Sequence, residues 1–275
     1  LLSYLPTHLV IFLLSLLWFS FLQPWGSFRD PDSFYHAKLT DIILHGTNAI
    51  GAQGTQFAHL FFLQNFPWLD LTLLSTNFVD QHLLYHLALV PFVAILGMFK
   101  GVQVATVIFA SLFISAFYYL VRNLRLQHPE LWTFLIAVSM PLSFRLSLGK
   151  ATPFALSFFT LGLVSLVGAR SSRPSIKRAE EPRPYKNIAL AFLAGLGFAL
   201  SHGGWILLLI SQALFILGTT IFDYLTCDKN IKRLSSTLKN SILDTRYSIL
   251  PTALGILLAL LIHPNRAHLL TFLKV

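Results

Sequence analysis

The sequence has little charge and almost no cysteine. Only 11% of its 275 residues are Asp, Glu, Lys or Arg, whereas soluble domains usually carry about 25%. Hydrophobic residues make up 55% of the chain, which argues against an ordinary soluble domain. Cys227 is the only cysteine, so no disulfide can form within the chain.

The common nucleotide-binding and hydrolase motifs are also missing. The chain has no Walker loop, no dinucleotide-binding glycine fingerprint, and no HExxH or GxSxG pattern. ATP hydrolysis and serine hydrolysis therefore have no support. The net charge of +9 does not indicate a nucleic-acid partner, because the basic residues form short clusters between apolar runs.

What the chain does have is a series of long apolar runs. A transmembrane helix needs about 20 mostly apolar residues, so these runs predict membrane spans. We expect an all-α, polytopic transmembrane bundle of about seven spans, with residues 1–275 forming one transmembrane domain in the lipid bilayer. The predicted spans are residues 5–23, 102–121, 131–147, 152–169, 188–203, 205–224 and 247–263.

The distribution of Lys and Arg predicts the orientation. Connectors 122–130, 170–187 and 225–246 hold 13 of the 20 basic residues, which makes them cytoplasmic by the positive-inside rule. Residues 24–101 then form an external loop, and its apolar stretch 83–99 should lie along the interface or re-enter. A shifted N-terminal topology is the alternative. We expect a multi-pass integral protein of a prokaryotic plasma membrane, with its active site on the extracytoplasmic face.

Ionisable residues gather on this predicted external side. Such residues are costly at the membrane edge and tend to mark functional sites. The long first loop contains five aspartates, and eight of the ten histidines fall on the same side. They are Asp30, Asp32, Asp41, Asp70 and Asp80, with His36, His45, His59, His82, His86, His202, His263 and His268.

Two segments of the first loop combine aspartate with histidine at helical spacing. Asp32 and His36 are four residues apart, which places them on one face of a helix. Together they can hold a divalent metal or act as an acid–base pair; alternatively, Asp30 or Asp32 only caps the helix. In the second segment Asp80 precedes His82 and His86, also four apart. Asp80, with His82 or His86, can complete a metal site with Asp32, although histidines at a membrane interface often only satisfy lipid or backbone groups.

Basic residues mark a further predicted turn on the external side. Arg145 and Lys150 suit a phosphate or diphosphate group, which Arg binds through two hydrogen bonds. Alternatively, both side chains anchor helix ends by snorkelling. His202 precedes Gly203 and Gly204, so it either reaches the site from its rim or belongs to a tight helix–helix turn.

With these residues in view, the chain resembles the GT-C superfamily of membrane glycosyltransferases, and most closely the oligosaccharyltransferase catalytic subunits. In that family the first external loop opens with a pattern such as D-x-x-Y-H/N-x-R, followed by a helix that ends in glycine. Asp32, Tyr35, His36, Lys38 and Gly46 match this pattern, with Lys in place of the usual Arg.

The sequence departs from the family's pattern in one segment. Residues 144–149 are similar to the family's R-S-x-A-G segment, but the acidic D-x-E motif that normally follows is replaced by a segment that begins at Lys150. Asp80 is then the candidate for the second acid. The family's C-terminal soluble domain is not present in these 275 residues, so we expect a transmembrane fragment.

The resemblance implies a glycosyltransferase that moves a sugar or oligosaccharide from a polyprenyl-phosphate-type lipid donor to an acceptor protein or glycan. Asp32 and Asp80 are then the expected catalytic residues, and with His82 they are the expected ligands of Mg or Mn. The expected substrate-binding residues are Arg145, Lys150, His36, Lys38 and His202. A polytopic transporter or lipid-linked sugar flippase without bond chemistry is the alternative function, and a non-catalytic membrane scaffold is a third.

Overall fold

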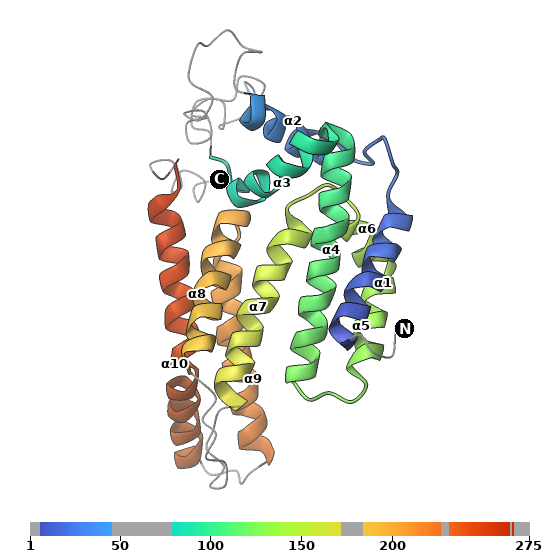
Figure 1. Cartoon of the computed structure of the whole chain (residues 1–275). Helices are drawn as coiled ribbons and strands as arrows, with labels where there is room; N and C mark the ends of the chain where they lie inside the picture. The colour runs from blue at the N-terminus through green and yellow to red at the C-terminus, as the bar shows by residue number, and fades with distance from the viewer. Residues whose placement is uncertain (1–5, 46–78, 172–183, 227–230, 265, 267–275) are drawn as a thin grey trace.

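The computed structural model describes residues 6–45, 79–171, 184–226, 231–264 and 266 (Figure 1). These residues contain ten helices and no strand, which confirms the expected all-α class. Gly46 and the 46–78 part of the predicted external loop lie outside the described residues. The helices are α1 (Thr7–Leu22), α2 (Pro31–His45), α3 (Leu83–Leu96), α4 (Met98–Asn123), α5 (Pro129–Val138), α6 (Met140–Leu146), α7 (Thr152–Ser171), α8 (Pro184–Ser201), α9 (Ile206–Thr226) and α10 (Ile231–Ile262).

The long helices lie side by side and form the body of a bundle. α4 packs against α1 and α7, α8 packs against α7 and α10, and α9 packs against α10. Figure 1 shows α2 and α3 lying across one end of these helices instead of along them. Ala37 of α2, Tyr85 of α3 and Phe109 of α4 belong to one buried cluster, so the cross-lying helices are part of the core.

The stretch at 83–99 does not form another helix of the parallel bundle, in agreement with the sequence analysis. Its helix, α3, has 14 residues, which corresponds to a length of about 21 Å. Gly97 follows with a φ of 78°, a conformation that glycine adopts without steric cost. The chain therefore changes direction at Gly97 and begins α4 at the next residue.

The span expected at 131–147 is instead two helices, α5 and α6, separated at Ser139. Pro141 explains the break, because it has no N–H to donate to the carbonyl oxygen of Ala137 four residues earlier. Trp18 Nε1 donates to that oxygen at 3.1 Å, and the Ser143 hydroxyl donates to it as well. The ten residues of α5 reach only about 15 Å, which is half of a bilayer core.

Two helical segments in the described residues are long and apolar enough to cross a membrane. They are Met98–Asn123, with a mean hydropathy of 2.1, and Thr245–Ile262, with a mean hydropathy of 1.7. Six further apolar segments have 10–17 described residues. This finding favours membrane association only weakly, since the core helix of a soluble protein meets the same criteria.

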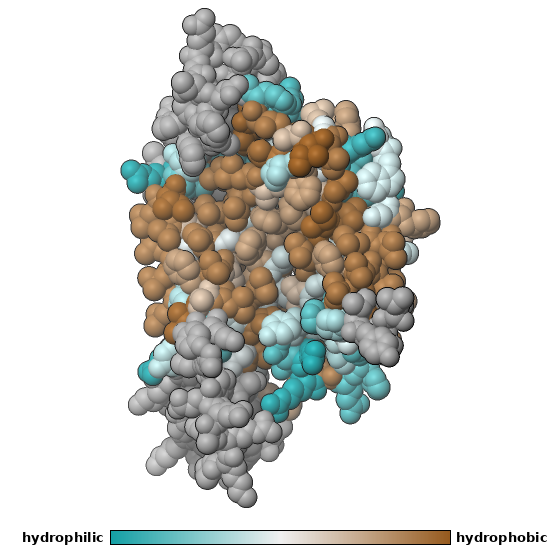
Figure 2. Space-filling model, in the orientation of Figure 1, coloured by the Kyte–Doolittle hydropathy of each residue, from teal (hydrophilic) through white to brown (hydrophobic). Residues whose placement is uncertain are grey.

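The surface of the bundle is unusually apolar along its sides. Figure 2 shows hydrophobic residues over the middle of the molecule and hydrophilic residues toward its two ends. Large apolar side chains are exposed on several helices, among them Leu17 at 69%, Phe21 at 81%, Leu214 at 62% and Leu254 at 57%. Soluble monomers rarely expose continuous apolar surface of this extent.

α8 and α10 are packed closely enough that their backbones touch. A Cβ atom at Gly195 of α8 would overlap the carbonyl oxygen of Thr252 in α10, and one at Gly255 of α10 would overlap the carbonyl oxygen of Phe192 in α8. Small residues allow helix backbones to approach in this way. The contact therefore depends on the absence of side chains at Gly195 and Gly255.

We expect Gly195→Ala to force α8 and α10 apart and to destabilise the protein by about 1–3 kcal/mol, as overpacked cores do. Thermal unfolding in detergent measures the effect. Gly218→Ala in α9 is the matched control, because a Cβ there would meet no atom within 4 Å. Equal unfolding temperatures for the two variants would contradict the close contact.

Candidate functional site

Two groups of polar side chains meet at the end of the bundle that α2 and α3 cover. The first, called here the acid–lysine cluster, consists of Asp30, Asp32, Ser33 and Lys150. Lys150 Nζ lies 2.6 Å from Asp32 Oδ2 and 3.1 Å from Asp30 Oδ2, and Ser33 donates a hydrogen bond to Asp30 Oδ1. The Asp32 side chain is 64% exposed, whereas those of Asp30 and Lys150 are 15% and 19% exposed. The cluster therefore presents one accessible carboxylate.

Local sequence explains how the cluster forms. Pro31 is the first residue of α2, where its missing N–H costs no hydrogen bond. Asp32 follows in the first turn, where the helix dipole favours a negative charge. Lys150 comes from the turn between α6 and α7, and this turn is attached to α2 because the Gly149 N–H donates to Ser33 Oγ at 3.0 Å.

Lys150 occupies the position that a cation would take between the two carboxylates. Its partial burial by itself lowers the pKa, but the hydrogen bonds and charges of Asp32 and Asp30 raise the pKa above its ordinary value. Lys150 is therefore positively charged at every physiological pH. Two aspartates and one ammonium group together carry a net charge of −1.

The second group, called here the histidine row, is a chain of hydrogen bonds from Asp80 through His86 to His36. His86 Nδ1 lies 2.9 and 2.8 Å from the two carboxylate oxygens of Asp80. His86 Nε2 lies 2.7 Å from His36 Nδ1. Asp80, His86 and His36 are 5%, 0% and 5% exposed, so the row is held away from bulk water and its rings have fixed orientations.

Further hydrogen bonds connect the row to several parts of the chain. The backbone N–H of His82 donates to Asp80 Oδ1 at 3.0 Å, and His82 Nδ1 lies 2.9 Å from the carbonyl oxygen of Ser201 at the end of α8. His263, which follows α10, places Nε2 2.9 Å from the carbonyl oxygen of Asp80. Helices α2, α3, α8 and α10 thus meet around Asp80.

His202 both belongs to the turn between α8 and α9 and lies beside the histidine row. Its Nδ1 accepts a hydrogen bond from the Gly204 N–H at 2.9 Å, and its ring stacks on Phe198 with centroids 5.8 Å apart, so it stabilises the α8–α9 turn. Its ring centroid is also 5.7 Å from that of His82. His202 therefore lies beside the histidine row as well.

Burial and neighbouring charges set the protonation of the row. Burial by itself raises the pKa of the Asp80 carboxyl, but His86 and His82 together hold that pKa below its ordinary value. Burial lowers the pKa of His36, and the charges of His86, His82 and Lys150 lower it further. The effect of Lys150 on His36 also shows that the acid–lysine cluster and the histidine row are neighbours. Asp80 is therefore ionised and His36 neutral at pH 7.

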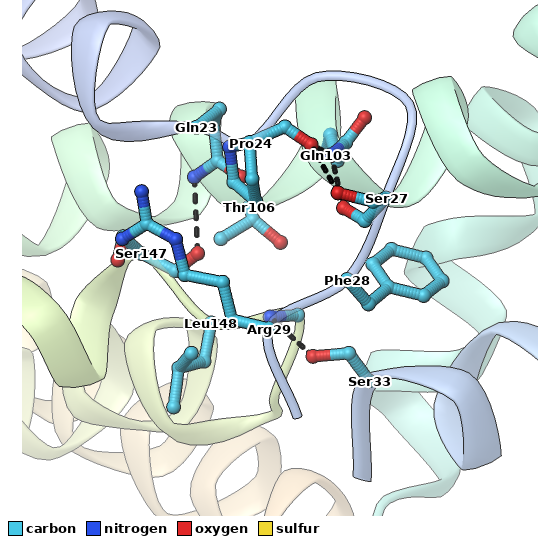
Figure 3. Close-up of a pocket in the computed structure, with 11 residues that line it drawn as sticks. Gln23, Pro24, Ser27, Phe28, Arg29, Ser33, Gln103, Thr106, Ser147 and Leu148 are labelled. Atoms are coloured by element: carbon cyan, nitrogen blue, oxygen red, sulfur yellow. Dashed lines mark hydrogen bonds between the residues drawn. The ribbon is translucent and has the colours of Figure 1, made fainter. Parts of the chain in front are cut away.

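A small polar cleft lies beside the acid–lysine cluster (Figure 3). It is small and open to solvent, and Ser33 and Gly149 form part of its wall. Gln103 of α4 donates to the carbonyl oxygens of Pro24 and Ser27 at 2.8 Å each, which fixes the segment between α1 and α2. Gln23 Nε2 donates to the carbonyl oxygen of Ser147 at 3.1 Å. These hydrogen bonds hold together the segments that form the cleft.

Two predicted substrate-binding residues lie outside both groups. Arg145 is exposed in the last turn of α6, and its side chain has no hydrogen bond or ion pair within the described residues. Lys38 forms an exposed ion pair with Asp41, with Nζ 2.9 Å from Oδ2. The structure therefore brings together Asp32, Lys150 and His36 but leaves Arg145 and Lys38 on the surface.

The predicted metal ligands do not form a metal site in the part of the chain that the structure describes. Asp32 pairs with Lys150, Asp80 pairs with His86, and His82 Nδ1 faces a backbone carbonyl. Within the described residues, no group of three or more His, Cys, Asp or Glu side chains is arranged to hold a metal ion. The donor set therefore does not fit the expected Mg or Mn.

Sequence reasoning does not identify the roles of Asp30 and His86. The sequence predicts Asp30 as a possible helix cap. In the structure its Oδ2 is buried and pairs with Lys150. His86 reads as a possible metal ligand, yet it lies at the centre of the histidine row. The sequence shows only that Asp80 and His86 lie close together along the chain. The turn at residues 80–82 is what brings the Asp80 carboxylate against the His86 ring.

Comparison with known proteins found no match for this chain among protein-family models, curated proteins or solved structures. The expectation of a GT-C glycosyltransferase therefore rests on the motif residues around Asp32 in the sequence.

We expect Lys150→Met to destabilise the protein by about 1–3 kcal/mol, the usual cost of leaving a buried polar group without its partner. The buried Oδ2 of Asp30 has no hydrogen bond within the described residues and relies on the ion pair with Lys150. Thermal unfolding in detergent measures the loss. Lys100→Met is the control because Lys100 is exposed in α4, and an equally large effect there would contradict the prediction.

The lowered pKa of His36 predicts that acid destabilises the fold. The unfolded chain binds a proton to His36 below its ordinary pKa of 6.5, whereas the folded protein resists this protonation. Stability should therefore fall as the pH drops below about 6.5, by up to about 1.4 kcal/mol per pH unit from this residue. His36→Asn should make the unfolding temperature less steeply dependent on pH between 7 and 5, and identical slopes would contradict a neutral His36.

Proposed function

We propose that the chain is a multi-pass membrane protein with the acid–lysine cluster at its extracytoplasmic end. The apolar sides and polar ends of the bundle support this (Figure 2). Helices α4, α7 and α9 end, and α8 and α10 begin, at the end of the bundle opposite to α2 and α3 (Figure 1). The three connectors rich in Lys and Arg therefore leave the bundle at the end predicted to be cytoplasmic.

We propose further that the protein transfers a sugar or oligosaccharide from a polyprenyl-phosphate donor to a hydroxyl or amide of an acceptor protein or glycan. The observation that carries the proposal is an exposed carboxylate, Asp32, that sits beside a fixed ammonium group, Lys150, at the edge of an apolar bundle. A lipid tail can lie against the apolar sides while its phosphate reaches the polar end.

Each group has a role in this reaction. Asp32 accepts a hydrogen bond from the acceptor and orients its nucleophilic atom. Lys150 stabilises the negative charge that develops on the leaving phosphate, and Arg145, exposed on α6 near the same turn, adds positive charge there. Because the described residues do not fit a divalent metal, these side chains supply the electrostatic stabilisation.

A transporter or flippase is the second candidate, and one specific feature favours it. Polar side chains that are fully buried meet between α7, α9 and α10 in the body of the bundle. Ser165 Oγ lies 2.6 Å from Ser248 Oγ, and Gln212 Nε2 donates to Thr252 Oγ1 at 3.1 Å. Buried polar residues inside a bundle mark transport pathways in some membrane proteins, and in others they only connect helices.

We expect Asp32→Asn to reduce sugar transfer about 100-fold, the range typical of a reacting group that is no longer correctly positioned. The assay supplies a labelled polyprenyl-phosphate sugar to the purified protein in bilayers and measures the labelled acceptor. Asp41→Asn is the matched control, since Asp41 is a second carboxylate of α2 that forms an ion pair with a lysine, and transfer should persist.

Two results would contradict the proposed transfer. Undiminished transfer by Asp32→Asn would remove Asp32 from the reaction. Movement of the intact lipid-linked sugar across the bilayer without cleavage of its bond to phosphate would instead support the flippase.

A further inference from the structure

Arg29 is a charged group that the described part of the protein leaves largely unused. It directly precedes Asp30 in the segment between α1 and α2, yet the ion pairs of Asp30 and Asp32 are both with Lys150. Arg29 forms no ion pair with a described residue, and the one hydrogen bond of its side chain to those residues runs from Nη2 to the carbonyl oxygen of Leu22 at 2.7 Å. A guanidinium group is always charged and has five N–H donors. Most of these donors are therefore available to an anion.

The Arg29 side chain is fixed at both of its ends. Its backbone follows Phe28, whose ring packs against that of Phe99 in α4 with centroids 5.0 Å apart. Gln103, also in α4, accepts a hydrogen bond from the Gly26 N–H at 3.1 Å and donates two more to the same segment. The guanidinium end is held by the last residue of α1. A side chain that is ordered in advance loses little conformational entropy when it binds a ligand.

Arg29 lies where an apolar surface meets a polar one. It is exposed and forms part of the wall of the cleft, and its side chain extends toward Gln23 and Ser147 (Figure 3). The last turn of α1 carries Phe21, which is 81% exposed, and Trp25 just after this helix is 52% exposed. Tryptophan is typical of the boundary between the hydrocarbon core and the headgroups. With α1 in a bilayer, Arg29 is therefore at the level of the lipid phosphates.

A phosphate at this position needs the positive charge of Arg29. The acid–lysine cluster by itself carries a net charge of −1, which repels an anion. Arg29 neutralises this charge, and Arg145, exposed in the last turn of α6 without a partner among the described residues, makes the total positive. The two arginines belong to the same corner of the site, because Gln23 after α1 donates to the carbonyl oxygen of Ser147 after α6 at 3.1 Å.

We propose that Arg29 binds the phosphate group of an isoprenoid lipid at the mouth of the cleft, with Arg145 as a second cation. The proposal rests on the proposed sugar transfer, which requires a polyprenyl-phosphate donor. The N–H groups that Leu22 leaves free can hold two oxygens of one phosphate, a geometry that guanidinium groups favour. The isoprenoid tail then extends along the apolar side of α1. The phosphate also lies near Lys150, because Gly149 forms part of the cleft wall.

Arg29 also closes the end of α1, so the variants must separate this structural contact from phosphate binding. Arg29→Gln removes the charge and keeps an amide donor, whereas Arg29→Lys keeps the charge and loses the planar pair of donors. Arg266→Gln is the matched control. Arg266 is exposed and donates from Nη1 to the carbonyl oxygen of Leu261, near the end of α10, at 3.4 Å, and it does not line the cleft.

The experiment measures lipid binding by the full chain in bilayers of phosphatidylcholine. Phosphorus-31 NMR follows the signal of an added polyprenyl phosphate, which is separate from that of the bulk lipid. Three competitors are then added in excess: the polyprenol without its phosphate, phosphatidylglycerol and inorganic phosphate. Thermal unfolding of each variant in detergent checks the fold, and sugar transfer is measured on the same samples.

We expect the wild type and Arg266→Gln to bind polyprenyl phosphate equally well. Arg29→Gln should weaken binding about tenfold or more, because the loss of a hydrogen bond between charged groups has an effect of this size. Arg29→Lys should weaken binding less. None of the competitors should displace the polyprenyl phosphate. Binding by the wild type should also weaken as salt is added, a result that does not depend on the folding of any variant.

Unchanged binding by Arg29→Gln would overturn the role of Arg29. Displacement by the polyprenol would show that the tail alone is recognised, and displacement by phosphatidylglycerol or inorganic phosphate would show a site for any phosphate; either result would overturn the proposal. Failure of the proposed function is recognised separately. Binding with the expected dependence on Arg29 but without sugar transfer by the wild type would contradict the transferase and support the phosphate site.

Discussion

The buried carboxylate of Asp80 is the constraint on which the site depends. An ionised group held away from water is costly unless hydrogen bonds surround it, and here His86 and the backbone N–H of His82 supply them. The same residue receives His263 at its carbonyl oxygen. Because these partners come from α3 and from the chain after α10, satisfying Asp80 assembles the end of the bundle. His36 of α2 is then aligned through His86.

The exposed part of the site depends on a second set of charges, those of Asp30, Asp32 and Lys150. The resemblance to GT-C enzymes implies an acidic motif after residue 149, and this chain has Lys150 there instead. In the structure the ammonium group of Lys150 bridges Asp30 and Asp32, whereas the second acid expected for a metal site was Asp80. Opposite charges a few ångströms apart need no metal between them. The site is therefore built from an ion pair and a row of imidazoles.

Several features of the fold follow from the sequence, and others do not. The all-α class and the distinct behaviour of residues 83–99 follow from apolar runs and from the positions of the basic residues. The break of the predicted 131–147 span does not follow from hydropathy, although Pro141 gives a local reason for it. The carbonyl oxygen that Pro141 leaves free is satisfied by Trp18 from α1, a partner more than 100 residues away that no local pattern reveals.

The sequence by itself determined which residues are capable of chemistry and that Asp32 and His36 share a helix face, because helical spacing is a local property of the chain. Only the tertiary structure decided which of them are paired. The pairing of Lys150 with Asp30 and Asp32, and of His86 with Asp80 and His36, depends on how α2, α3 and the α6–α7 turn pack together. Such contacts join residues up to 120 positions apart, as Asp30 and Lys150 are, and their distances arise from the packing of whole helices, which no single segment encodes.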